Sequence, residues 1–131
     1  GQYAFLYCNS LTSVTIPNSV TSIDSGAFAY CKSLTSVTIP DSVTSISSSA
    51  FRECSSLTNI DIPSGVTSIG DVAFHLCTSL TSVTVNATTP PTLGYNVFDN
   101  TNNSPIYVPA ASVDAYKSSW SRYADRIQPI T

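Results

Sequence analysis

The phrase Ala-Phe-x-x-Cys-x-Ser-Leu-Thr recurs along this chain at intervals of 23 residues. Its four copies in strict register place phenylalanines at Phe5, Phe28, Phe51 and Phe74. A unit of this size buries its apolar face only against neighbouring copies, so the copies must stack. The repeat therefore predicts a solenoid, and a solenoid presents its function on an extended surface rather than in a pocket.

Each copy contains two extended runs. In the first copy, Val14 and Ile16 alternate with Ser13 and Thr15, which is the period of two of a β-strand with one buried face. Pro17 follows and ends the strand, because proline has no N–H to donate to a neighbouring strand. A shorter extended run follows. We expect equivalent runs of successive copies to lie in parallel, about 4.8 Å apart.

Apolar residues return at near-helical spacing after the second run. Between the first and second copies they are Ile23, Ala27, Phe28 and Cys31, and this spacing favours a single helical or 3₁₀ turn. One coil of the solenoid is then a strand, a corner, a short strand and a helical turn.

The repetition fades toward the C-terminus. The fourth copy departs from the pattern at Asn86, which replaces the proline, and a degenerate fifth coil follows around Phe98. Beyond Pro109 the apolar residues are spaced three and four apart, which is typical of an amphipathic helix. Ser112 is the expected N-cap, and the weak helix formers Ser118 and Ser119 favour a break before Trp120. The helical stripe consists of Val113, Tyr116, Trp120, Tyr123 and Ile127.

These observations predict a single domain in two parts. Residues 1–109 form the solenoid, and residues 110–131 form a C-terminal cap packed on its open end. No such cap covers the N-terminal end, so we expect the chain to be a fragment of a longer protein. The exposed N-terminal edge, with Tyr3 near it, could then support end-to-end self-association.

Composition excludes several classes of function. Only 10% of the residues are charged and the net charge is −3, so the chain lacks the basic clusters that nucleic-acid binding needs. No apolar run approaches the roughly 20 residues needed to cross a bilayer. The single histidine, His75, stands at a variable position that we expect to be exposed, and no serine is singled out as its nucleophile. We expect neither catalysis nor a cofactor.

The repeat resembles a known family. The segment from Ala27 to Ile46 reads Ala-Phe-x-x-Cys-x-Ser-Leu-Thr-Ser-Val-Thr-Ile-Pro-x-Ser-Val-Thr-Ser-Ile, which looks like the BspA-type leucine-rich repeat of bacterial surface proteins. The resemblance covers about residues 4–86, and the tail after Ile106 is similar to the terminal segments of such proteins from gut and oral Bacteroidetes.

The resemblance implies a right-handed leucine-rich-repeat solenoid of four coils and a degenerate fifth, closed by a C-terminal capping helix. It also implies a secreted or cell-surface protein of the adhesin type, whose relatives bind host matrix or plasma proteins. It supplies no catalytic residues.

The candidate binding residues lie on the outward side of the first run of each copy. This surface is rich in hydroxyl groups and can hydrogen-bond a partner protein or a glycan, although serine and threonine also suit a plain solvated scaffold. All three interpretations stay open. Asn59 and Asp61 break the Ser/Thr pattern and are the best single candidates. The full set is Ser13, Thr15, Ser36, Thr38, Asn59, Asp61, Ser82 and Thr84.

One cysteine per coil forms a further column. Stacked coils would bring neighbouring Cα atoms to a distance that permits a disulfide. However, the cysteines share a repeat position beside an inward phenylalanine, where a free thiol is a good small core residue. A metal site is disfavoured because no Cys-x-x-Cys or paired histidine accompanies them. The cysteines are Cys8, Cys31, Cys54 and Cys77.

Overall fold

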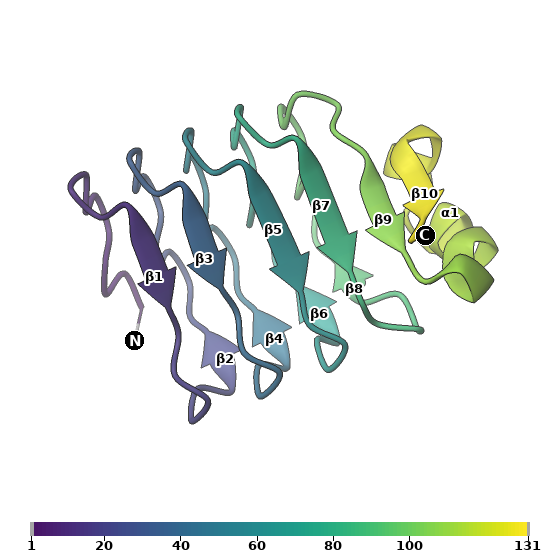
Figure 1. Cartoon of the computed structure of the whole chain (residues 1–131), viewed down its shortest axis with the longest axis horizontal. Coiled ribbons are helices and arrows are strands. Elements are labelled where there is room, and N and C mark those ends of the chain that lie inside the picture. The colour runs from purple at the N-terminus through teal and green to yellow at the C-terminus, as the bar shows by residue number, and fades with distance from the viewer. Residues whose placement is uncertain (1, 131) are drawn as a thin grey trace.

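The computed structural model describes residues 2–130, and these form a stack of coils with parallel strands (Figure 1). The first run of each coil gives the front strands, and the second run gives a second sheet behind them. The predicted solenoid is confirmed. The front strands are β1 (Ser13–Thr15), β3 (Ser36–Thr38), β5 (Asn59–Ile62), β7 (Ser82–Val85) and β9 (Ile106–Val108). The second sheet contains β2 (Ser22–Ile23), β4 (Ser45–Ile46), β6 (Ser68–Ile69) and β8 (Thr92–Leu93).

The strand register follows the repeat. Val14 pairs with Val37 and Ile60 pairs with Val83, so equivalent residues of neighbouring copies lie side by side. The second sheet is continuous from β2 to β8. In its last pair Ser68 aligns with Thr92, one residue further than the repeat length. The inserted residue lies where the fourth copy departs from the pattern, which explains why Phe98 comes one position late.

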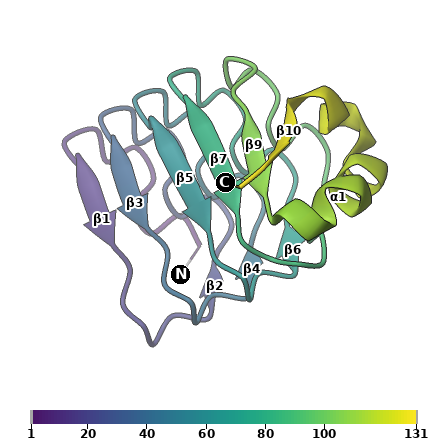
Figure 2. The ribbon, with the colours of Figure 1, turned by 45° about the vertical axis from the view of Figure 1, so that its right-hand side comes forward.

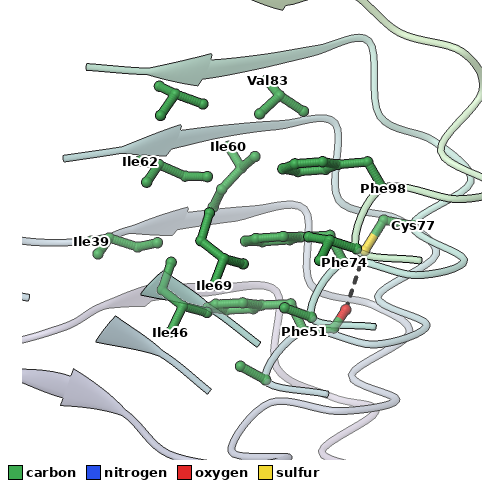
Figure 3. Close-up of a cluster of buried hydrophobic side chains, with 14 of the residues drawn as sticks. Ile39, Ile46, Phe51, Ile60, Ile62, Ile69, Phe74, Cys77, Val83 and Phe98 are labelled. Carbon is green, nitrogen blue, oxygen red and sulfur yellow. Dashed lines mark hydrogen bonds between the residues drawn. The ribbon is translucent and has the colours of Figure 1, made fainter. Parts of the chain in front are cut away.

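The core is a column of phenyl rings between the two sheets. Phe28 and Phe51 stack with their ring centroids 5.3 Å apart and their planes 5° from parallel, and Phe74 and Phe98 continue the column (Figure 3). Phe51 and Phe74 are fully buried. Figure 3 shows the inward isoleucines of the strands, such as Ile60 and Ile69, packed beside the rings.

The expected helical or 3₁₀ turn is wrong in detail, because this segment consists of successive β-turns. The N–H of Ala27 donates to the carbonyl of Asp24 within the coil, whereas the N–H of Phe28 donates to Ala50 in the next coil. Gly26 (φ 63°) and Tyr30 (φ 61°) lie in the left-handed region. A continuous helix cannot form here, since alternate N–H groups are committed to the neighbouring coil.

The tail covers the C-terminal end of the stack, as Figure 2 shows. It comprises the 3₁₀ helix η1 (Ala110–Ser112), the helix α1 (Val113–Ser119), the 3₁₀ helix η2 (Ser121–Arg126) and the strand β10 (Ile127–Pro129). The predicted break before Trp120 is confirmed. The helix does not extend to Ile127, which pairs instead with Ile106 of β9. Ser112 is not a side-chain N-cap, because its hydroxyl donates to the carbonyl of Thr88.

Side chains of the tail donate hydrogen bonds to backbone carbonyl groups that a further coil would otherwise pair with. The Tyr116 hydroxyl donates to the carbonyl of Ala87 at 2.6 Å, and the Trp120 indole N–H donates to the carbonyl of Pro91 at 2.9 Å. The Arg126 guanidinium donates to the carbonyls of Phe98 and Ser104. Buried carbonyls without partners cost free energy, so these bonds let the stack end here.

A salt bridge fastens the tail to the fifth coil. Arg122 donates to both carboxylate oxygens of Asp99, at 3.0 and 2.6 Å, and the Tyr123 hydroxyl donates to the same group at 2.7 Å. The Arg122 hydrogen bond, supported by that of Tyr123, holds the pKa of the Asp99 carboxyl below its ordinary value.

The Asp99 contact predicts a pH dependence of stability. A carboxyl whose pKa is lowered by folding stabilises the fold above its unfolded pKa, about 3.9, and loses that contribution as the pH falls through the folded value. We expect Asp99→Asn to lower the Tm at pH 7, and the difference in Tm from the original chain to shrink below about pH 4.

The matched control is Asp125→Asn, which removes an exposed carboxylate from η2 and should leave the Tm unchanged at both pH values. Thermal unfolding followed by circular dichroism measures both variants. A loss of Tm in Asp99→Asn that is equally large at pH 7 and pH 3 would show that the ionised contact does not stabilise the tail.

Candidate binding surface

The strand face is defined here as the outward side of the front strands together with β10. The structure places all eight predicted residues on it, in rows across neighbouring strands: Asn59 pairs with Ser82, and Asp61 pairs with Thr84. The six residues from the first three coils are exposed, and Ser82 and Thr84 are half-buried. The second row continues from Thr84 to Tyr107 and Gln128, which the sequence interpretation missed.

Many hydroxyl groups elsewhere in the repeat form hydrogen bonds between neighbouring coils. The threonine after each repeat leucine donates to the carbonyl of its equivalent in the preceding coil, as Thr35 does to Thr12 at 3.0 Å and Thr81 to Thr58 at 2.9 Å. Thr44 and Thr67 do the same beside the second sheet. Within residues 2–130, the serines and threonines of the strand face make no such side-chain bonds, so their hydroxyls remain available to a partner.

The strand face is hollowed between β3 and β5. The hollow has a volume of about 300 Å³ and includes both Asn59 and Asp61. Asp41, from the corner after β3, and Asn86, from the end of β7, also line it, although the sequence interpretation did not assign them to a site. Asn86 did carry a signal, because it replaces the repeat proline. The other lining residues are Ser36, Val37, Thr38, Ile39 and Pro63.

One side of the hollow is held in place by an amide. The Asn86 Nδ2 group donates to the Asp61 carboxylate and, at 3.1 Å, to the carbonyl of Ile62. Both hydrogen-bonded partners belong to β5, so Asn86 fixes the orientation of Asp61 from the neighbouring coil. A proline at position 86, as in the first three copies, could not make these bonds.

Other hollows have a different character. One of about 420 Å³ on the second sheet is lined by serines, glycines and the strand residues Ile46 and Ile69, without a charged group. An apolar one of about 210 Å³ lies at the N-terminal end, beside Phe5 and Phe28. A third, of about 420 Å³, contains the salt-bridged Asp99 and Arg122 of the tail.

The cysteine column is made of free thiols. Cys54 donates its S–H to the carbonyl of Phe28 at 3.1 Å, and Cys77 donates to Phe51 at 3.2 Å (Figure 3). Burial raises the pKa of Cys77 to about 12 and also raises that of Cys54 and Cys31. Because the thiolate is the reactive form, these groups act as core residues rather than as nucleophiles. Cys8 in the first coil is half-buried.

The environment of His75 differs from that expected from the sequence. His75 is half-buried rather than exposed, and its buried Nδ1 has no hydrogen-bond partner among residues 2–130. No cluster of three or more metal-binding side chains occurs in this range. None of its helices has the length and apolar character to cross a membrane.

Comparison with known proteins gives a family. The model for the BspA type leucine rich repeat region matches residues 1–122 with six copies. None of the curated proteins matches the chain closely enough to count as a relative.

Solved structures of bacterial leucine-rich-repeat proteins are similar. A leucine rich cell surface protein of Faecalibacterium prausnitzii is 38% identical, with a TM-score of 0.62 over 73% of this chain and 31% of that one. A leucine-rich repeat protein of Eubacterium ventriosum is 26% identical, with a TM-score of 0.68 over 92% of this chain and 32% of that one. The chain thus spans about a third of the length of these two structures. The leucine-rich-repeat protein of T. pallidum, 21% identical with a TM-score of 0.54 over 97% of this chain and 77% of that one, shares the fold.

Proposed function

Because the chain belongs to the BspA-type leucine-rich repeat family, we propose that it is a non-enzymatic recognition module of a secreted or cell-surface bacterial protein. Its strand face binds a protein outside the cell, such as a host matrix or surface protein, and so serves adhesion. The similarity to a solved bacterial cell surface protein supports this location.

The observation that carries the proposal is the open strand face. Among residues 2–130 its serine and threonine hydroxyls make no side-chain hydrogen bonds, whereas threonines beside the strands bond the preceding coil. The face also contains the hollow with Asn59 and Asp61. Rows of exposed polar groups around a hollow suit contact with a protein surface, where hydrogen bonds fix orientation and a few central residues supply most of the affinity.

Obstruction of the strand face tests the proposal. Thr38→Trp places a large side chain in the hollow of this face. We expect it to reduce binding to immobilised matrix and plasma proteins at least about tenfold, because hot-spot contacts are worth about 2 kcal/mol or more. Ser48→Trp, an exposed site beside the second sheet, is the control and should bind like the original chain. Biolayer interferometry measures both, with Tm as a check of folding.

Two other results would argue against adhesion. Binding to a glycan array without affinity for any protein of the panel would favour the alternative, a glycan-binding module. The absence of binding to both would favour a structural spacer in a larger surface protein. Equal loss of binding in Thr38→Trp and Ser48→Trp would remove the strand face as the site.

The N-terminal end is a second place where association is expected. Tyr3, Phe5 and Tyr7 are 55%, 46% and 59% exposed, and the outer edges of β1 and β2 have no partner strand among the described residues. Unpaired edges next to exposed rings favour association of chains end to end. Sedimentation velocity should therefore show a concentration-dependent dimer that Phe5→Lys abolishes, whereas a monomer at all concentrations would refute this contact.

A further inference from the structure

The front strands separate at one place. β1 pairs with β3, and β5, β7, β9 and β10 form a second group, but no ladder joins β3 to β5 within residues 2–130. At this seam the amide nitrogen of Thr58 lies 3.4 Å from the carbonyl oxygen of Thr35. One coil further on, the amide nitrogen of Thr81 lies only 2.7 Å from the carbonyl oxygen of Thr58. The second sheet is continuous behind the seam. The seam is therefore confined to the strand face, and the hollow lies on it.

Two carboxylates lie in this hollow without a cation. The Asp41 side chain is exposed and makes no hydrogen bond within the described residues, and Asp61 uses one oxygen to accept from Asn86. The salt bridge found in residues 2–130 joins Arg122 to Asp99 in the tail, so neither carboxylate of the hollow has a basic partner there. The outward residues of the strands supply hydroxyl, amide and phenol groups but no positive charge.

Several polar atoms around the hollow are free acceptors, beside the hydroxyl groups of Ser36 and Thr38 and the amide of Asn59. Asp61 has one oxygen free, and Asp41 has two. Because the Asn86 Nδ2 group donates to β5, its side-chain oxygen remains as a further acceptor. A volume of about 300 Å³ is at the lower limit for ligand sites, which suits one inserted side chain better than a larger ligand.

We infer that this hollow holds the guanidinium group of an arginine side chain presented by the bound protein. The inference rests on the proposed function of the strand face and names the partner's chemistry. A guanidinium has five N–H donors in a planar fork and no acceptor, which matches two carboxylates and an amide oxygen. Lysine fits less well, because its ammonium group is a compact and strongly hydrated charge. Arginine is also enriched among the residues that dominate protein interfaces.

The direct test uses a peptide probe. The blocked tripeptide Ac-Gly-Arg-Gly-NH₂ is titrated into the ¹⁵N-labelled chain, and the same peptide with citrulline, which has a similar shape but no charge, is the control. We expect the arginine peptide at millimolar concentration to shift the side-chain amide signals of Asn59 and Asn86, and the citrulline peptide to leave them in place.

Carboxylate variants locate the contact. Asp41→Asn and Asp61→Asn should each weaken binding of the peptide about tenfold, since a hydrogen bond to a charged group contributes about 1.5–3 kcal/mol. Asp114→Asn, an exposed carboxylate on α1, is the matched control and should not change the affinity. Tm values of the variants show whether each one is folded.

Several outcomes would overturn the inference. One is the absence of signal shifts with the arginine peptide, or equal shifts with the citrulline peptide. Another is equal affinity of Asp41→Asn, Asp61→Asn and Asp114→Asn for the arginine peptide. Signal shifts caused by CaCl₂ alone would indicate a cation site instead. If Thr38→Trp abolishes binding to a matrix protein while Asp41→Asn and Asp61→Asn leave it unchanged, the strand face remains the binding surface and only the arginine contact is wrong.

Discussion

Backbone hydrogen bonds that run along the stack, from one coil to the next, are the interaction on which the rest of this structure depends. Neighbouring coils are joined at the second strand, in the turns and, except between β3 and β5, by a ladder of the front strands. Examples are the bonds from Ser47 to Ile23, from Phe28 to Ala50 and from Thr35 to Thr12. Equal coil lengths keep these bonds in register, and the one extra residue of the fourth coil is accommodated before β8, where Ser68 aligns with Thr92. The constant interval between phenylalanines is the consequence, because it keeps both the bonds and the ring column aligned.

The same bonds create a problem at the end of the stack, since the last coil leaves carbonyl groups without partners. The tail solves it with side chains rather than with a further coil. Tyr116, Trp120 and Arg126 donate to carbonyls of the fourth and fifth coils, and β10 pairs with β9. The strand face, with its seam between β3 and β5, is a surface that this bonding leaves open, and it is there that we propose binding takes place.

The sequence predicts the stack well because inward side chains repeat. It does not show which backbone N–H groups point to the next coil, and so it predicts the local backbone structure less well. The turn segment has helix-like apolar spacing, yet alternate N–H groups such as that of Phe28 point to the next coil. Ile127 continues the helical stripe in the sequence but lies in a strand. Asn59 and Asp61 stand out in the sequence, whereas Asp41 reaches the same hollow from a corner of the preceding coil. Only the lateral stacking of coils brings these residues together. The division of the chain at residue 109 stays a prediction.

The central claim is that a rigid stack offers one free surface to a partner, the strand face. Amide hydrogen exchange of the chain, alone and with a matrix or plasma protein that it binds, tests this most directly. The account predicts slow exchange throughout the ladders in the free chain, and added protection on binding confined to segments 36–41 and 59–63 and their neighbours on the strand face. Protection instead on β2, β4, β6 and β8, or in the turns, would contradict it.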